Sequence, residues 1–229
     1  MTIGLVLLTV IAILIFFGLS DKFFSHLGIA PWLGFVLTIA LIVGAVIPDI
    51  TIGTGFVFNI GGFIVPIVGM IILMAFIGWN RGLVRVIFAE LVFAAIAVAT
   101  RVLILPESTG MILASSIIVG IIGGTAAFLI TGSRIGTLAS VMGGVVIGDI
   151  IVNLIYVFGI GGYVFSMGTR GVFDSLIIGL VFGVLLLEAV VTARRTTSNR
   201  RVVKSSMNTE ASKDVNKDEF DDYFDDKIL

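Results

Sequence analysis

The chain has 229 residues, of which 58% are hydrophobic and only 13% are charged, and its formal net charge is −1. A water-soluble domain of ordinary composition is excluded, because long apolar runs recur along most of the chain. Cysteine is absent, which excludes disulfides, thiolate metal sites and cysteine nucleophiles. We therefore expect the lipid bilayer to be the solvent of this protein, and we expect no nucleic-acid partner.

Seven apolar runs are long enough to cross a bilayer. A spanning helix needs roughly 20 mainly apolar residues, and charged residues near the hydrocarbon centre are unfavourable. The runs are residues 3–19, 27–47, 56–79, 84–105, 111–131, 135–158 and 172–191. The sequence thus predicts an all-α fold, a polytopic transmembrane helix bundle of about seven spans within residues 1–192.

Basic residues near the ends of these runs predict the orientation in the cell membrane, because such residues collect on the cytoplasmic side. With an odd number of spans, nine basic residues lie on one side and two on the other. The nine are Lys22, Arg81, Arg85, Arg134, Arg194, Arg195, Arg200, Arg201 and Lys204, and the two are Arg101 and Arg170. The N-terminus is therefore predicted outside and the C-terminus in the cytoplasm.

Residues 193–229 are predicted to form a disordered cytoplasmic tail. The tail is first basic and then acidic, with too few apolar residues to fold alone. Phe220, Tyr223 and Phe224 are spaced so that they share one helix face, which suits docking to a cytoplasmic protein. The alternative is a solvated tail that aids solubility and topology.

Two segments that lie 100 residues apart are similar to each other. Residues 44–63, aligned without gaps to 144–163, are identical at ten of twenty positions, and Asp49 aligns with Asp149. An aspartate and a Gly-Gly pair in register are harder to obtain by chance than apolar identities. We therefore predict a parallel internal repeat of three spans, one linker span and three spans (3+1+3). Its halves are about residues 27–79 and 135–191.

The sixth run carries a stripe of polar side chains. Asn153 and Tyr156 follow Asp149 at i+4 and i+7, so the three share one helix face. Lipid offers a carboxylate, an amide or a phenol no hydrogen-bond partner, so this face is predicted to meet protein or water. One interpretation is a hydrogen-bonded clamp between helices, for which Asp149→Asn should be mild, and the other is a ligand or proton site.

Three further polar residues complete the candidate set for binding a ligand or ion. Asp49 follows Pro48, which fits either a broken helix that exposes backbone dipoles or an ordinary exposed turn. Asn59 precedes a Gly-Gly pair, and Asp174 opens the last run, where it is placed to cap the helix. No catalytic or metal-binding constellation is predicted, any cofactor is unknown, and a homo-oligomer is compatible with the sequence.

Several motifs together resemble an uncharacterised bacterial and archaeal family of predicted multi-pass membrane proteins. They are residues 59–66 (NIGGFIVP), 136–138 (GTL), 147–154 (IGDIIVNL) and 171–174 (GVFD). The resemblance covers roughly residues 27–190. It departs from the family pattern at two places. The Gly-Ala-Asp spacing of the family is shortened here to Gly148-Asp149, and the glycine-rich run that precedes Phe173 is degraded. It implies a membrane protein and leaves the chemistry open.

Two functions follow from these patterns. The first is a small ion- or proton-coupled transporter or channel-like protein, with Asp149 and Asp49 as its polar centres. The second is a non-catalytic membrane scaffold or regulator that recruits a cytoplasmic partner through its acidic tail. An intramembrane aspartyl protease is disfavoured, because Val146 replaces a glycine of the Gly-x-Gly-Asp element. Polar side chains that converge on one solvated cavity would favour transport, and dispersed, individually bonded ones would favour the scaffold.

Overall fold

The computed structural model of the chain divides into two compact units, Met1–Leu187 and Glu188–Leu229. The residues that the structure describes are 3–16, 31–53, 55–78, 81–104, 108–160, 164–169, 171–186, 188–190 and 192–193. In the second unit, the described residues are helical. The predicted docking residues of the tail, Phe220, Tyr223 and Phe224, lie outside the described residues.

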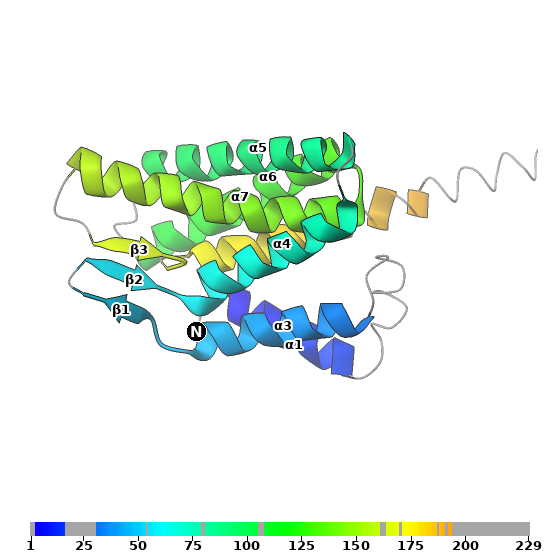
Figure 1. The fold of residues 1–229 in the computed structure, drawn as a ribbon, viewed down its shortest axis with the longest axis horizontal. Helices are drawn as coiled ribbons and strands as arrows, with labels where there is room; N and C mark the ends of the chain where they lie inside the picture. The colour runs from blue at the N-terminus through cyan, green and yellow to red at the C-terminus, as the bar shows by residue number, and fades with distance from the viewer. Residues whose placement is uncertain are drawn as a thin grey trace, which may run out of the picture. The chain divides into compact units, whose positions relative to one another are not determined.

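Most of the first unit is helical (Figure 1). Its α-helices are α1 (Ile3–Phe16), α3 (Pro31–Val46), α4 (Val65–Ile77), α5 (Arg81–Leu103), α6 (Thr109–Thr131), α7 (Arg134–Leu154) and a C-terminal helix of residues 172–186. Two π-helical segments, η1 (Ile60–Ile64) and η2 (Ile155–Ile160), extend α4 at its start and α7 at its end.

Five helices in the described part of the chain are long and apolar enough to cross a membrane. They are Ile60–Ile77, Arg81–Leu103, Thr109–Thr131, Arg134–Gly159 and Val172–Val190. The described parts of α1 and α3 have 14 and 16 residues, which is short of a full span. The structure is thus compatible with the predicted integral membrane protein, whereas the count of seven spans stays a prediction.

Local capping chemistry explains where α6 ends and α7 begins. Gly132 ends α6 in the left-handed region at φ 59°, which glycine adopts without steric cost. The next residue, Ser133, caps α7 because its hydroxyl oxygen accepts a hydrogen bond from Gly136 N at 3.2 Å. Ser108 caps α6 in the same way, accepting from Met111 N at 3.3 Å. The capping signals are therefore local: Ser108 precedes α6, and Gly132 and Ser133 separate α6 from α7.

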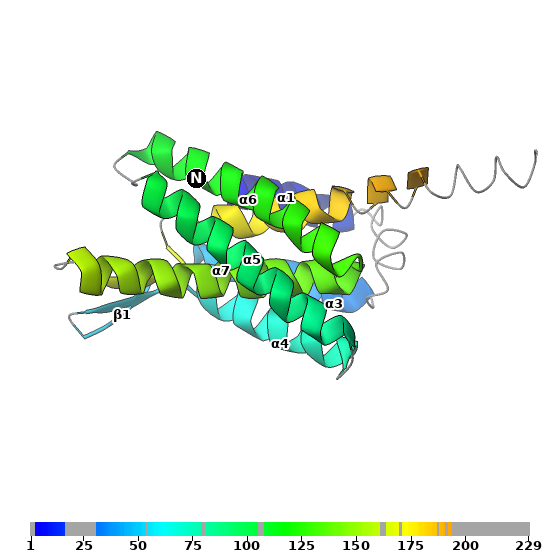
Figure 2. The ribbon, with the colours of Figure 1, turned by 90° about the horizontal axis from the view of Figure 1, so that it is seen from above.

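The centre of the bundle is the pair α5 and α7, which run in the same direction and cross each other (Figure 2). Small residues let their backbones approach: a methyl group on Gly144 would lie 2.5 Å from Phe93 Cβ, and one on Gly148 would lie 2.9 Å from Ala97 Cβ. α6 and the C-terminal helix approach in the same manner at Gly124, where a methyl group would lie 2.6 Å from the carbonyl oxygen of Gly179.

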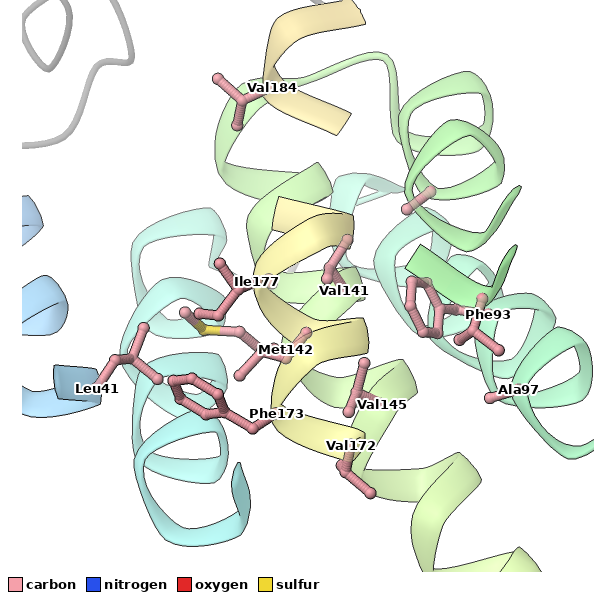
Figure 3. Packing of buried hydrophobic residues seen from close by; sticks show 14 of the residues in the cluster. Leu41, Phe93, Ala97, Val141, Met142, Val145, Val172, Phe173, Ile177 and Val184 are labelled. Atoms are coloured by element: carbon pink, nitrogen blue, oxygen red, sulfur yellow. The ribbon is translucent and has the colours of Figure 1, made fainter. Parts of the chain in front are cut away.

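Buried apolar side chains fill the space between these helices. Figure 3 shows Phe93 of α5, Val141 and Met142 of α7 and Ile177 of the C-terminal helix within this core. Phe93, Val141 and Ile177 are completely buried. The core holds the polar face of α7 at a fixed rotation relative to α5, and this positions the site described below.

A small sheet lies at the end of the bundle where α3 and α7 end (Figure 1). β1 (Ile50–Ile52) pairs antiparallel with β2 (Phe56–Phe58), and β2 pairs parallel with β3 (Phe165–Met167). In the register, Phe58 faces Ile50 on one side and Met167 on the other. The predicted all-α class misses this sheet, because strands of three residues give almost no periodic signal in sequence.

The sheet also bears on the predicted 3+1+3 repeat. α3 and α7 both run toward the sheet, as a parallel repeat requires (Figure 1). The aligned segments that follow them differ, since residues 50–58 form the β1–β2 hairpin whereas residues 150–160 continue α7 and η2. The local structure therefore does not support the duplication over this stretch, although the sequence identity there is high.

Candidate functional site

The site begins with Asp149, which α7 turns toward the last turn of α5. Arg101 of α5 donates from Nη1 to Asp149 Oδ1 at 3.1 Å and forms an ion pair with it. The second carboxylate oxygen, Oδ2, accepts a hydrogen bond from the backbone N–H of Gly168 at 2.7 Å. The side chains of Arg101 and Asp149 are only 11% and 3% exposed. Both oxygens of this buried carboxylate are therefore bonded by donors from within the protein.

The other two residues of the polar stripe bind neighbouring segments. Asn153 donates from Nδ2 to the carbonyl of Asp149 at 2.9 Å and accepts from the backbone N–H of Ser166 in β3 at 3.0 Å. The hydroxyl of Tyr156 donates to the carbonyl of Arg101 at 3.0 Å. The stripe therefore faces protein, and it fastens α7 to β3 and η2 to α5.

A cavity of about 30 Å³ lies beside the ion pair. This volume is enough for about one or two water molecules and too small for an organic substrate. Its lining is Arg101, Ile104, Ser115, Asp149, Val152, Asn153, Tyr156, Ser166 and Thr169. The cavity brings together three of the predicted site residues with polar side chains of α6 and of the segment around β3.

Hydroxyl groups extend this network to the C-terminal helix. Arg101 Nη2 lies 3.4 Å from the hydroxyl oxygen of Ser175, which itself donates to the carbonyl of Gly171 at 2.9 Å. The hydroxyl of Ser116 in α6 donates to the same carbonyl at 2.9 Å. Four helices, α5, α6, α7 and the C-terminal helix, thus meet through polar groups at this end of the bundle.

Asp174 lies apart from the ion pair and binds α1. Its Oδ1 accepts a hydrogen bond from the backbone N–H of Gly4 at 2.7 Å, in a buried position. A methyl group on Gly4 would lie 3.1 Å from the Cα of Asp174, so the two helices are close. This bond holds α1 against the C-terminal helix, and the predicted cap of its own helix by Asp174 stays a prediction.

Asp49 and Asn59 form a third, more exposed group. Asn59 Nδ2 donates to Asp49 Oδ1 at 2.8 Å, and Asn59 Oδ1 accepts from the backbone N–H of Gly62 at 2.7 Å. Asp49 is exposed, three residues beyond the end of α3 at Val46. Asp49 thus lies in an exposed, non-helical connection between α3 and β1, and the helix does not resume beyond it.

The six predicted site residues therefore occupy three places. Asp149, Asn153 and Tyr156 meet at the cavity, Asp49 and Asn59 bind each other near the sheet, and Asp174 binds α1. In the described part of the chain, no cluster of three or more His, Asp or Glu side chains is placed to hold a metal ion.

Sequence reasoning missed the two partners of Asp149. From the sequence, Arg101 is only a basic residue near the end of the run 84–105, and that position is a weak signal for a partner of an intramembrane carboxylate. Gly168 gave none, because it acts through its backbone N–H, a group that every residue except proline carries. Comparison of the chain with protein-family models, with curated proteins and with solved structures finds no match.

Proposed function

We propose that this integral membrane protein is a non-catalytic scaffold or regulator, and that its intramembrane polar residues are clamps between helices. The observation that carries the proposal is that both carboxylate oxygens of Asp149 accept hydrogen bonds from the protein, one from Arg101 and the other from the N–H of Gly168. The dispersal of the other candidate carboxylates to separate partners supports the same conclusion.

The charge of Arg101 is the physical reason to prefer a clamp. A transported cation would have to displace the guanidinium group or sit beside it, and two like charges within a few ångströms repel strongly where little water is present. The carboxylate would also have to give up the hydrogen bond from Gly168. A permanently charged internal partner therefore competes with any cation for Asp149.

The regulator part of the proposal depends on the tail. With the C-terminus in the cytoplasm, Phe220, Tyr223 and Phe224 would present an aromatic face to a partner beside the membrane. Reporter fusions after Arg81, after Arg134 and in the tail are expected to report a cytoplasmic location for all three. A tail on the opposite side from the other two would contradict the orientation, and with it the recruitment of a cytoplasmic partner.

A second candidate function, ion or proton transport, is favoured by the cavity beside Asp149. The cavity has room for water and is lined by hydroxyl groups from Ser115 and Thr169 in addition to the stripe on α7. In this alternative, Arg101 would leave the carboxylate during each cycle, and water in the cavity would take its place.

Ion flux in lipid vesicles separates the two candidates. The wild-type chain, Asp149→Asn and the matched control Asp49→Asn are reconstituted and tested under proton, sodium and potassium gradients. The scaffold proposal predicts no flux above that of empty vesicles for any of the three. Flux in the wild type that Asp149→Asn abolishes would overturn the scaffold in favour of transport, because an amide cannot titrate or neutralise a cation. Retention of that flux in Asp49→Asn would assign transport to the cavity at Asp149, and its loss would include Asp49 as a second polar centre.

A further inference from the structure

Glu90 is a second buried carboxyl group in the bundle, and none of the contacts described above uses it. It is the tenth of the 23 residues of α5, which places it about 14 Å along a helix of about 35 Å. The hydrocarbon core of a bilayer is about 30 Å thick, so this position is close to the membrane centre. Glu90 is only 4% exposed.

The carboxyl group of Glu90 lies in the space that a glycine leaves open. A methyl group on Gly143 of α7 would overlap Glu90 Oε1, and it would also come within 2.8 Å of the Met70 sulfur from α4. Three helices, α4, α5 and α7, therefore close around this carboxyl group. The carboxyl group therefore fills the space beside a residue without a side chain, and a methyl group at position 143 would require Glu90 or Met70 to shift.

Glu90 Oε1 is fully buried and has no hydrogen-bond partner within the part of the chain that the structure describes. The ion pair between Arg101 and Asp149 does not involve Glu90. α4 and α6 contain no charged residue, and α7 contains only Arg134, at its start, and Asp149, which is bonded to Arg101. On α5 itself, the remaining cations are Arg81 and Arg85, both exposed.

We propose that Glu90 is an intramembrane proton-binding site, whose ligand is a single proton held in the closed junction of α4, α5 and α7. An ionised carboxylate sealed in an apolar environment without a counter-charge is strongly unfavourable, whereas the neutral acid is tolerated. The bound proton thus stabilises the closed packing, and release of the proton requires α4 or α7 to move away from the carboxyl group. This site is independent of the clamp at Asp149 and of the scaffold proposal.

Infrared spectroscopy of the full chain in lipid vesicles tests the proposal directly, because a protonated carboxylic acid has a C=O stretch that a carboxylate lacks. At neutral pH, the wild type is expected to show an acid band that shifts when glutamate is labelled with carbon-13. The band should be lost in Glu90→Gln and retained in the matched control Glu188→Gln, which changes the other glutamate of the described helices.

A second variant keeps the test decisive if Glu90→Gln does not fold. Glu90→Asp retains a carboxyl group, so an acid band should remain but should no longer shift with labelled glutamate. Absence of any glutamate acid band in the wild type at neutral pH would overturn the proposal without reference to a variant. Persistence of the labelled band in Glu90→Asp, or its loss in Glu188→Gln, would assign the proton to another residue and also overturn the proposal.

Discussion

The buried ion pair between Arg101 and Asp149 provides the most direct test of how this end of the bundle is held together. At the observed distance of 3.1 Å, two unit charges attract by about 5 kcal/mol if the effective dielectric constant is about 20. Much of this attraction offsets the cost of taking both charges out of water. Removal of one partner from such a pair typically costs about 3–5 kcal/mol, because the remaining charge stays buried without compensation.

Asp149→Asn is the perturbation that isolates the charge. The amide oxygen can still accept the hydrogen bond from Gly168 N, and the side chain keeps its size. The guanidinium group of Arg101 then loses its counter-charge, although its side chain is only 11% exposed and water compensates little. We therefore expect a loss of about 3 kcal/mol in the free energy of unfolding. This result differs from the mild effect that a simple hydrogen-bonded clamp predicts, because the partner in the structure is a cation.

The double variant Arg101→Gln with Asp149→Asn is expected to recover most of this loss. Both buried charges are then removed together, and such replacements are often close to neutral in stability. The coupling energy in the double-mutant cycle should therefore be about 2 kcal/mol or more. Asp49→Asn is the matched control, since Asp49 is exposed, and its effect should stay within about 0.5 kcal/mol.

The assay is reversible unfolding in mixed micelles, followed by far-ultraviolet circular dichroism and by the fluorescence of the two tryptophans. Each variant is compared with the wild type at the same detergent composition. The reasoning would be refuted if Asp149→Asn were as stable as the wild type, or if the double variant lost the sum of the two single effects.

Three further predictions concern the packing around the site. Gly144→Ala should cost about 1–3 kcal/mol of unfolding free energy, because its methyl group would overlap Phe93, whereas Gly55→Ala, with no atom within 4 Å, should change stability little in the same assay. Asn153→Ala should cost about 1 kcal/mol, because the part-buried N–H of Ser166 in β3 loses its acceptor; an unchanged midpoint of unfolding would contradict this. Asp174→Ala should increase hydrogen exchange in α1, which loses its bond to the C-terminal helix, while Asp49→Ala should leave that exchange unchanged.

The sequence by itself determined the apolar, mainly helical character of the chain and where several helices end. Hydropathy is a local property, so long apolar runs identify membrane helices without any knowledge of their neighbours. Capping is local as well, since Ser108, Gly132 and Ser133 act on backbone groups within four residues of themselves. The polar stripe on α7 could also be predicted, because Asp149 and Asn153 lie one turn apart on the same helix.

Only the tertiary structure decided which groups bind this stripe. Arg101 is 48 residues from Asp149, and Gly168 contributes a backbone N–H, which its side-chain type does not reveal. A membrane helix is apolar on the side that faces lipid and on the side that faces its neighbours, so its sequence does not show which residues will meet another helix. That choice depends on the rotation and crossing of α5 against α7, which Gly144 and Gly148 permit by letting the two helices pack closely.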